Sequence, residues 1–470
     1  MLAPDQTRWS TPPACGFRWA ESGCRRSMRL KQSIAYQLAA ALLGGSWQVD
    51  ELVQRGGGLF DKRPRWLRPL AGRIAAAFGG LPRPRIAVLA EFIAYDAVFQ
   101  RYEQHWRGWP LEISSWPLRS AAMSPCAGRP TTWNVPDLPT PGALAQWLEM
   151  TPRQLDWFAD RQGRERGLPA GPLRHYHYRW VPKRAGGVRL IEIPKSRLRA
   201  IQRRVLHGIL ENIPPHDAAH GFRRGRSIRT FVAPHVGQRV VLRMDLQDFF
   251  MTIAAGRVCA LFRITGYPEA VAALLAGLCT NSLPADAWED EAYQLAAGHT
   301  RRQDSQRWPH LPQGAPTSPA VANLCAYRLD CRLSALAGSM EAQYTRYADD
   351  LVFSGGQDFQ RAIQRFHLYI GSIALEEGFR VHARKTRIMR RSVRQQAAGV
   401  VINARPCIRR GDYDRLKATL HNCVRHGPAT QNRRSVRDFK SHLAGRVSYV
   451  AMLHPARGKR LRAIFDRIAW

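Results

Sequence analysis

Two adjacent aspartates, Asp349 and Asp350, lie between two short runs of β-forming residues. The segment reads QYTRYADDLVFSGG over residues 343–356, which predicts a β-hairpin whose turn contains both carboxylates. Like charges in adjacent positions between hydrophobic strands repel each other and are poorly hydrated. A divalent cation would remove that cost. The pair therefore constrains the fold strongly, because the hairpin must belong to a sheet that presents its turn to a cation.

A third aspartate ends another predicted strand, VVLRMDLQDFF, over residues 240–250. Apolar residues alternate from Val240 to Met244, so we expect one strand face to lie in the core and the other to carry Asp245 at its end. Three carboxylates from two neighbouring strands suit a two-metal phosphoryl-transfer site, because Mg²⁺ prefers a few carboxylates together with water and phosphates. Two such ions about 4 Å apart can activate the attacking oxygen and stabilise the leaving one. The competing interpretation, an aspartate pair that only caps a surface hairpin, leaves Asp245 unexplained.

The charge of the chain indicates a polyanionic partner. Its 470 residues include 71 Lys or Arg against 36 Asp or Glu, a net charge of +35. Nucleic acid is the leading candidate, and an anionic membrane surface is the alternative. No apolar run reaches the roughly 18 residues of a transmembrane helix, so we expect none. The nine cysteines are scattered without a C-x-x-C pair, which predicts reduced thiols in a cytoplasmic protein and argues against a zinc site.

The texture of the sequence changes along the chain. We expect residues 1–27 to be disordered, with translation starting at Met1 or at Met28. The periodicity of residues 28–108 predicts a helical domain, and residues 109–140, rich in Pro, Trp, Ser and Thr, predict a linker. Further along, short β-type runs alternate with helical stretches, which is typical of an α+β fold. The last segment, about 405–470, returns to helix, and residues 391–470 carry 18 Lys or Arg against 4 Asp.

Three motifs resemble those of reverse transcriptases. The residues YADD at 347–350 resemble the family's YxDD box, and Asp245 with Phe250 five residues later resembles its first palm motif. The residues LPQGAPTSP at 311–319 resemble the motif between them, and the order and spacing also match. The segments most similar to the bacterial retron type are AHGFRRGRS (219–227) and GRVSYVAMLHPARGKRL (445–461).

The resemblance implies an α+β fold of the right-hand polymerase type, with fingers, a ferredoxin-like palm and a thumb, preceded by the helical domain. It implies an enzyme that copies an RNA template into DNA from dNTPs with two Mg²⁺ ions and binds the RNA–DNA hybrid. We expect it in the cytoplasm and not on a membrane. The expected boundaries are fingers at 141–239, palm at 240–404 with a fingers insertion at about 262–310, and a basic helical thumb at 405–470.

The resemblance also implies roles for individual residues. The family's metal-binding aspartates correspond to Asp245, Asp349 and Asp350, which would be catalytic, and the Leu246 carbonyl would be a further ligand. Phe250 would lie beneath the sugar of the incoming nucleotide, where a bulky ring excludes a 2′-hydroxyl and favours dNTPs over rNTPs. An ordinary core position is the alternative for Phe250.

The middle motif is expected to support the nascent base pair. Gln313 and Gly314 would lie beneath the template–nucleotide pair, where only glycine allows close backbone approach. Behind them, Ser318 followed by Pro319 predicts one helix that holds this turn and ends at Gly338.

Basic side chains are expected around the nucleotide and the template. Residues 180–195, WVPKRAGGVRLIEIPK, predict a hairpin that turns at 185–187 and resembles the family's fingers hairpin. A helix from Ser196 follows, and we interpret its arginines as template-phosphate contacts. Ordinary solvated surface charges are the alternative for the hairpin cations and for Lys385. The residues assigned to the nucleotide are Lys183, Arg189, Phe250, Gln313, Gly314 and Lys385, and those assigned to nucleic acid are Arg197, Arg199, Arg203, Arg204 and Tyr347.

Two retron signatures are incomplete. Retron enzymes typically carry Asn-Ala-x-x-His, but residues 231–235 read FVAPH, so only His235 is retained. They also carry Val-Thr-Gly, but residues 397–399 read AAG, so only Gly399 is retained. Whether the protein binds a cognate noncoding RNA is therefore an open question. Taken alone, His235 is more often a satisfied loop histidine than a functional group.

The sequence therefore predicts an RNA-directed DNA polymerase, of the retron type that makes multicopy RNA-linked DNA (msDNA) and takes part in antiphage defence. A defence-associated reverse transcriptase without a retron RNA is one alternative. A catalytically silent RNA-binding scaffold on a polymerase fold is another, and the intact aspartates argue against it.

Overall fold

The computed structural model of the chain describes residues 34–44, 46–60, 63–80, 84–105, 123, 133–183, 188–288 and 308–470. These residues belong to two compact units, Met1–Arg129 and Pro130–Trp470. The segment 1–27, predicted to be disordered, lies outside the described residues, as does most of the predicted linker at 109–140.

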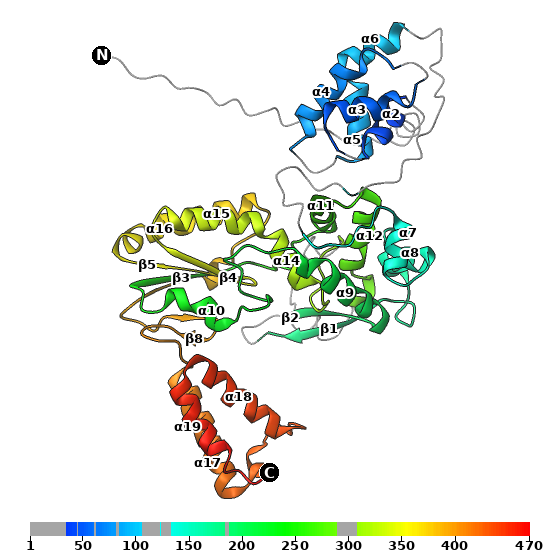
Figure 1. The fold of residues 1–470 in the computed structure, drawn as a ribbon. Helices are drawn as coiled ribbons and strands as arrows, with labels where there is room; N and C mark the ends of the chain where they lie inside the picture. Colours follow the sequence, from blue (N-terminus) through cyan, green and yellow to red (C-terminus); the bar gives the residue numbers. More distant parts are fainter. Residues whose placement is uncertain are drawn as a thin grey trace, which may run out of the picture. The chain divides into compact units, whose positions relative to one another are not determined.

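The described part of the first unit is a bundle of short helices around one apolar core (Figure 1). Leu38, Leu70 and Ile93 are completely buried in it. Asp96 accepts from the backbone N–H of Val98, at the start of one helix, and pairs with Arg73 of another at 2.7 Å. The helices are α2 (Ile34–Leu42), α3 (Val49–Gly57), α4 (Leu67–Phe78), α5 (Ile86–Ala94) and α6 (Ala97–His105).

A four-stranded antiparallel sheet forms the centre of the second unit. Its strand order is β4-β5-β3-β6, so the two segments that carry the aspartates are adjacent in the sheet. The predicted hairpin at 343–356 is present, because β4 and β5 pair directly. Its turn is Ala348-Asp349 and not the two aspartates, since Asp350 already begins β5 and pairs with Tyr347. The strands are β3 (Val240–Asp245), β4 (Gln343–Tyr347), β5 (Asp350–Gly355) and β6 (Arg387–Arg390).

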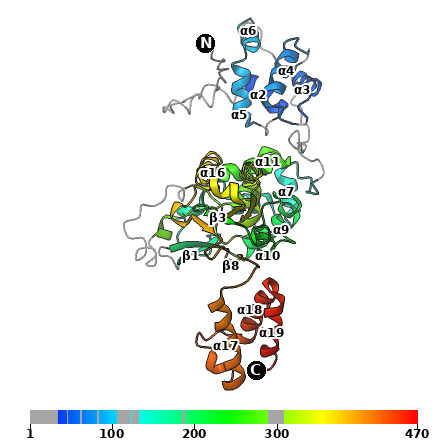
Figure 2. The same ribbon diagram turned by 90° about the vertical axis from the view of Figure 1, so that its left-hand side faces the viewer.

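Both faces of this sheet are covered. Two helices cross one face, and a short helix and a small hairpin cover the other (Figures 1 and 2). The covering elements are α15 (Tyr327–Gly338) and α16 (Gln357–Glu376) on the first face, and α10 (Ile228–Val232), β7 (Gln396–Ala397) and β8 (Val400–Val401) on the second.

The expectation that only one face of β3 lies in the core is therefore wrong. Val241 is completely buried and packs with Phe231 and Val352 on one side of the sheet, while Leu242 is completely buried on the other. Alternation predicts a solvated face only when one side of a sheet is left open, and here both sides carry a layer. Arg243 keeps partial exposure near the end of the strand.

The predicted hairpin at 180–195 is present as β1 (Tyr176–Pro182) and β2 (Val188–Pro194), which pair antiparallel with Pro182 opposite Val188. Its predicted turn at 185–187 lies outside the described residues. Helices pack beside this hairpin, and the first two have a threonine cap followed by proline as the first helical residue. In the second, the Thr151 side chain accepts from the Gln154 N–H, and the Gln154 side chain accepts from the Thr151 N–H. These helices are α7 (Pro141–Trp147), α8 (Pro152–Ala159), α9 (Ser196–Gly208), α11 (Ala255–Thr265) and α12 (Glu269–Cys279).

The single helix expected from Ser318 to Gly338 is two helices. The first, α14 (Ser318–Cys325), ends at Ala326, and α15 begins at Tyr327. The break separates the segment behind the Gln313 turn from α15, which packs against β4. An apolar period continues across such a break, and the sequence there contains no proline or glycine to mark it.

The C-terminal segment forms a three-helix group with its own core, which includes Leu420, Val447 and Leu461. A Cβ atom on Gly458 would lie only 2.3 Å from Ala451, so glycine permits the close crossing of two of these helices. The helices are α17 (Arg410–His426), α18 (Phe439–Leu453) and α19 (Pro455–Phe465).

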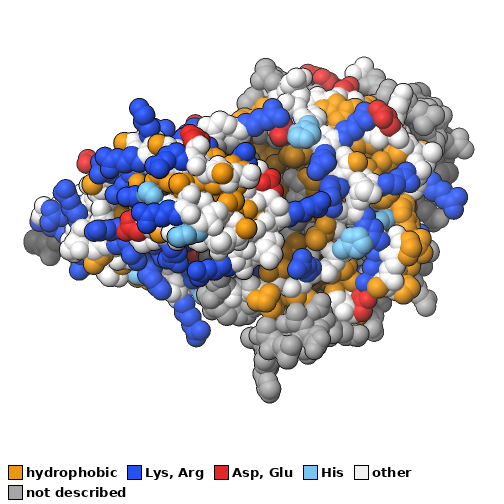
Figure 3. All heavy atoms as spheres, turned by 90° about the horizontal axis from the view of Figure 1, so that it is seen from below, with side chains coloured by type: hydrophobic (Ala, Val, Ile, Leu, Met, Phe, Trp, Pro, Cys, Tyr) orange, Lys and Arg blue, Asp and Glu red, His pale blue; other side chains and the backbone are white. Residues whose placement is uncertain are grey.

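The surface of the described chain is strongly basic. Lys and Arg side chains are spread over the face seen in Figure 3, and acidic side chains are sparse on it. Within the described ranges, no helix is both long enough and apolar enough to cross a bilayer.

We predict that His235 makes the stability of the fold depend on pH. The ring is completely buried, with Nδ1 2.6 Å from Ser354 Oγ and Nε2 2.8 Å from Thr345 Oγ1, so it links β4 to β5. Burial lowers the pKa of His235 from 6.5 to about 3. The neutral ring therefore contributes stability above pH 6.5 that is lost as the pH falls toward 3, about 2 kcal/mol by pH 5.

The measurement is the midpoint of thermal unfolding between about pH 5 and pH 8. His235→Gln should be less stable at neutral pH and should lose less stability on acidification than the wild type. The exposed His421→Gln is the matched control and should keep the wild-type slope. A His235→Gln slope equal to that of the wild type would contradict the prediction.

Candidate active site

Three aspartates meet at one end of the four-stranded sheet. Asp245 ends β3 and lies opposite Asp350, the first residue of β5, in the antiparallel register. Asp349 lies in the adjoining turn, where its carbonyl accepts from the Leu246 N–H at 2.8 Å. Ala348 adopts a left-handed backbone with φ of 55°, which closes the turn tightly. The sheet therefore brings the three predicted catalytic side chains together from segments a hundred residues apart.

Their surroundings show how the carboxylates affect one another. Burial, and then the charges of Asp245 and Asp350, raise the pKa of Asp349 to about 6. Burial also raises the pKa of Asp350, although Arg243 opposes the shift. The Lys385 Nζ lies 2.7 Å from Asp245 Oδ1, and the Arg243 Nη2 lies 2.6 Å from Asp350 Oδ1. The site is thus an acidic cluster that attracts cations and is partly shielded from water.

A cavity of about 450 Å³ opens onto this cluster and contains most of the predicted nucleotide-binding residues. Gly314 lies beside it, where a Cβ atom would be 2.5 Å from the Glu192 carbonyl oxygen, so only glycine fits there. The predicted residues that line the cavity are Lys183, Arg189, Asp245, Leu246, Phe250, Gln313, Asp349 and Lys385.

Comparison with known proteins identifies the family. Residues 181–402 match the family described as reverse transcriptase (RNA-dependent DNA polymerase). The Retron Mx65 reverse transcriptase of Myxococcus xanthus is 42% identical over 300 residues, which cover 62% of this chain and 65% of that protein. Residues 181–402 thus form a domain of the reverse transcriptase family.

Two further comparisons complete this finding. The Retron Mx162 reverse transcriptase of the same organism is 36% identical over 341 residues, 70% of this chain and 66% of that protein. The chain thus spans just under two thirds of the length of these two relatives. A solved structure of a foamy viral protease-reverse transcriptase in complex with RNA/DNA hybrid matches 64% of this chain and 32% of that chain. The sequence identity is 15% and the TM-score is 0.33.

The reverse transcriptase site has the donor chemistry of a divalent-cation site. Reverse transcriptases generally use divalent metals, and hard carboxylate oxygens are the ligands that Mg²⁺ prefers. In the described parts of the chain, no three His, Cys, Asp or Glu side chains are already arranged as a metal-binding group. Burial and then mutual repulsion raise the pKa of Asp349, and Asp245 and Asp350 each hold a cationic group. Both observations fit a site that binds positive charge.

The predicted template arginines of α9 lie away from the cavity of the reverse transcriptase site. Arg204 pairs with Glu149 at 2.8 Å, and Arg197 lies over the Phe158 ring at 5.4 Å. Arg199 donates to the Pro194 carbonyl, while Arg203 is exposed. The helix surface is basic, as predicted, but three of its four guanidinium groups have protein partners of their own.

Sequence reasoning missed Phe222, an aromatic residue that lines the reverse transcriptase cavity. Its ring is 54% exposed and lies 6.4 Å from Phe250 and 6.1 Å from Tyr347, measured between ring centroids. The backbone at Phe222 is left-handed, with φ of 57°, and a Cβ on Gly221 would lie 2.8 Å from the Ala348 nitrogen. The Gly-Phe pair in AHGFRRGRS was the available signal, because a large exposed ring after a tightly packed glycine marks a site more than a core.

Arg346 is a second missed residue, and it holds the turn of the reverse transcriptase site. It is completely buried, and its Nη2 lies 2.6 Å from Oδ2 of Asp330, which is also completely buried. Arg346 Nη1 donates to the carbonyl of Ala348 at 3.1 Å and to Asn323 at 3.0 Å. The sequence gives no sign of this burial, because an arginine in a short strand normally faces solvent.

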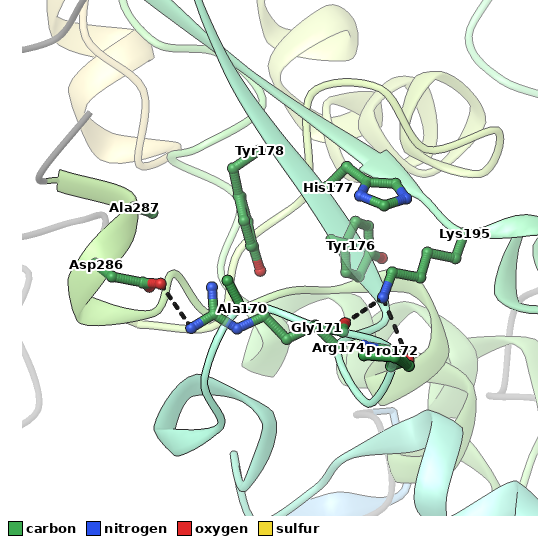
Figure 4. A pocket seen from close by; sticks show the side chains of 10 residues that line it. All are labelled: Ala170, Gly171, Pro172, Arg174, Tyr176, His177, Tyr178, Lys195, Asp286 and Ala287. Carbon is green, nitrogen blue, oxygen red and sulfur yellow. Dashed lines mark hydrogen bonds and ion pairs between the residues drawn. The ribbon is translucent and has the colours of Figure 1, made fainter. Parts of the chain in front are cut away.

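A second cavity, of about 540 Å³, lies beside the hairpin β1–β2 (Figure 4). It shares no lining residue with the cavity that contains Asp245 and Asp349. Its cations are directed at groups of the protein itself: Lys195 Nζ donates to the carbonyls of Gly171 and Pro172, and Arg174 pairs with Asp286 at 2.8 Å. These partners leave the carboxylate cavity as the candidate for the chemistry of the family.

Proposed function

We propose that this protein is an RNA-directed DNA polymerase, which extends a primer with dNTPs on an RNA template. The observation that carries the proposal is the cavity in which Asp245 and Asp349 face the basic residues Lys183 and Arg189. Phosphoryl transfer needs this combination, because negative charge develops on the triphosphate while the attacking hydroxyl loses its proton.

The side chains around the cavity divide the work of the reaction. Two Mg²⁺ ions held by the aspartates would activate the primer hydroxyl and stabilise the pyrophosphate. Lys183 and Arg189 would donate charge-assisted hydrogen bonds to the triphosphate. Phe250 would exclude a ribose 2′-hydroxyl, and Lys385 would give a proton to the leaving pyrophosphate.

We further propose that the enzyme is of the retron type and makes msDNA in antiphage defence. Its support is the similarity to two retron reverse transcriptases, which extends over more than half of this chain. A defence-associated reverse transcriptase without a retron RNA is favoured instead by the incomplete signatures at 231–235 and 397–399. Sequencing the nucleic acid that copurifies with the protein separates the two, because a retron enzyme should carry one discrete RNA–DNA species.

Primer extension on an RNA template with Mg²⁺ tests the proposed activity. The wild type should extend the primer, and product should require dNTPs. Binding of the RNA without any extension would instead support the catalytically silent scaffold.

We predict that Phe250→Ala relaxes the discrimination between dNTPs and rNTPs. Removing the ring opens space for a 2′-hydroxyl beneath the sugar, so the ratio of kcat/KM for rNTP to that for dNTP should rise about 100-fold, or about 2.7 kcal/mol. Phe250→Tyr keeps the bulk and is the matched control. An unchanged ratio in Phe250→Ala would assign the ring to the core instead.

A further inference from the structure

A buried carboxylate joins the β1–β2 hairpin to the turn beneath the proposed base pair. Glu192 of β2 is completely buried, and its Oε2 accepts from Asn281 Nδ2 at 2.7 Å. Its Oε1 lies 3.2 Å from His310 Nε2 and 3.4 Å from the Gln313 backbone nitrogen. The Glu192 N–H in turn donates to the Gln313 carbonyl at 3.1 Å. Backbone and side chain of one residue therefore hold the Gln313–Gly314 turn.

The geometry of His310 fixes the number of protons in this contact. Nδ1 lies 2.8 Å from the Trp308 carbonyl oxygen, which can only accept, so Nδ1 must carry a hydrogen. Nε2 faces the Glu192 oxygen, and two lone pairs at 3.2 Å would repel each other. A second proton must therefore lie on Nε2 or on the carboxylate. The pair holds one proton more than a neutral imidazole and an ionised carboxylate would hold together.

Water cannot easily take the place of the hydrogen bond between the two side chains, because the His310 side chain is 1% exposed and that of Glu192 is completely buried. Burial alone would lower the pKa of His310, but the charge and the hydrogen bond of Glu192 outweigh it and raise the pKa above 6.5. The backbone of His310 is also fixed, since it exchanges two hydrogen bonds of 2.9 Å with Asn281. The ring thus cannot turn away from the carboxylate without breaking this pairing.

We propose that Glu192 and His310 form a proton-dependent positioning pair, which keeps the Gln313–Gly314 turn seated against β2 for nucleotide binding. The nucleotide part of this inference rests on the proposed polymerase function. Loss of the shared proton at alkaline pH would leave the lone pair of His310 Nε2 facing the ionised Glu192 carboxylate. The two would repel each other, and the Gln313–Gly314 turn would be held less firmly against β2.

The two phenols and the thiol near the pair stay neutral through this pH range. Tyr176 and Tyr178 project from β1 on the same side (Figure 4), and burial raises the pKa of both phenols. Burial also raises the pKa of the Cys279 thiol of α12 to about 12. Glu165 and Arg174 are the charged side chains that also act on Tyr178. An alkaline titration at this place is therefore that of the pair.

Nitrogen NMR of histidine-labelled protein tests the proton without any polymerase assay. In the wild type, both ring nitrogens of His310 should be protonated at neutral pH, with a titration midpoint above 6.5. In Glu192→Gln, the side-chain amide can donate to a neutral Nε2, so this ring should lose one proton at neutral pH. A wild-type ring with an unprotonated Nε2, and a Glu192 carboxylate that is ionised by infrared absorption, would overturn the proposal.

Steady-state kinetics then test the positioning role. The wild-type KM for dNTP should rise about tenfold from pH 7 to pH 9, while kcat changes less. Glu192→Gln should lie within about threefold of the wild type at pH 7 and should show a flat KM profile. His310→Leu should have a raised KM at both pH values, with thermal unfolding as the check on its fold. Equal profiles in the wild type and Glu192→Gln would refute the role, whereas a wild type without any extension would refute the proposed function and leave the NMR result to decide on the pair.

Discussion

Asp349→Asn should abolish nucleotide addition and at the same time make the protein more stable. We expect primer extension to fall by at least about 10³-fold, as for the loss of about 4 kcal/mol of transition-state stabilisation. Stability should rise because the folded chain holds Asp349 at a pKa of about 6, above the ordinary value of 3.8. A carboxyl group with a raised pKa contributes stability below pH 3.8 that is lost as the pH rises through 6. At neutral pH the ionised group therefore destabilises the fold, by about 1 to 3 kcal/mol.

The stability measurement is thermal unfolding in buffer with a chelator, because a bound cation would stabilise the wild type by mass action. Asp349→Asn should unfold several degrees higher than the wild type at pH 7.5, and the difference should vanish on acidification. Asp358→Asn is the matched control, since Asp358 is exposed at the start of α16, and it should change neither property. An Asp349→Asn protein that unfolds below the wild type would show that the carboxylate stabilises the fold instead.

The largest loss of stability is expected from Asp330→Ala. Asp330 and Arg346 are both completely buried, and the pair is bidentate, with contacts of 2.8 and 2.6 Å. Removing one partner leaves an uncompensated charge in the interior, which costs about 3 to 5 kcal/mol. The Tyr344 hydroxyl also loses its acceptor. Chemical denaturation should show this difference directly.

A double variant separates the stability of this pair from its use in the site. Arg346→Met with Asp330→Leu replaces both charges by apolar groups, which is often close to neutral for folding. We expect it to recover most of the lost stability but not the activity, because a methionine side chain cannot donate to the Ala348 carbonyl that Arg346 holds. The exposed pair Arg361–Asp358 provides the reference, where Asp358→Ala should cost no more than about 1 kcal/mol. A cost this small for Asp330→Ala would contradict the buried-charge argument.

Local patterns were sufficient to predict the centre of the site. The alternation that ends at Asp245 and the turn at Asp349 each determine a strand and its end, and two such strands have few ways to pair. The packing of the sheet was harder to predict. Burial of both faces of β3 depends on α10 and α16, which are remote in the sequence. The sequence of β3 and its neighbours alone therefore could not show that both faces lie in the core.

The missed residues have a common cause: their roles depend on long-range contacts. Glu192 and His310 are 118 positions apart and read separately as a strand residue and a loop residue. Arg346 reads as a surface strand residue until Asp330 is placed beneath it. The phosphate contacts predicted for the α9 arginines stay a prediction, although Arg204 pairs with Glu149 in the free protein.

The contact between Lys385 and Asp245 gives the cleft an internal counter-ion. The Lys385 ammonium group contacts Asp245, and Arg243 similarly contacts Asp350, both of them proposed catalytic carboxylates. Loading the site with a divalent ion is then an exchange and not a simple addition, since the lysine must be displaced from Asp245. The chain can therefore fold with two of its three clustered carboxylates already paired. If Lys385 is the proposed proton donor, its release would be coupled to the arrival of the ion.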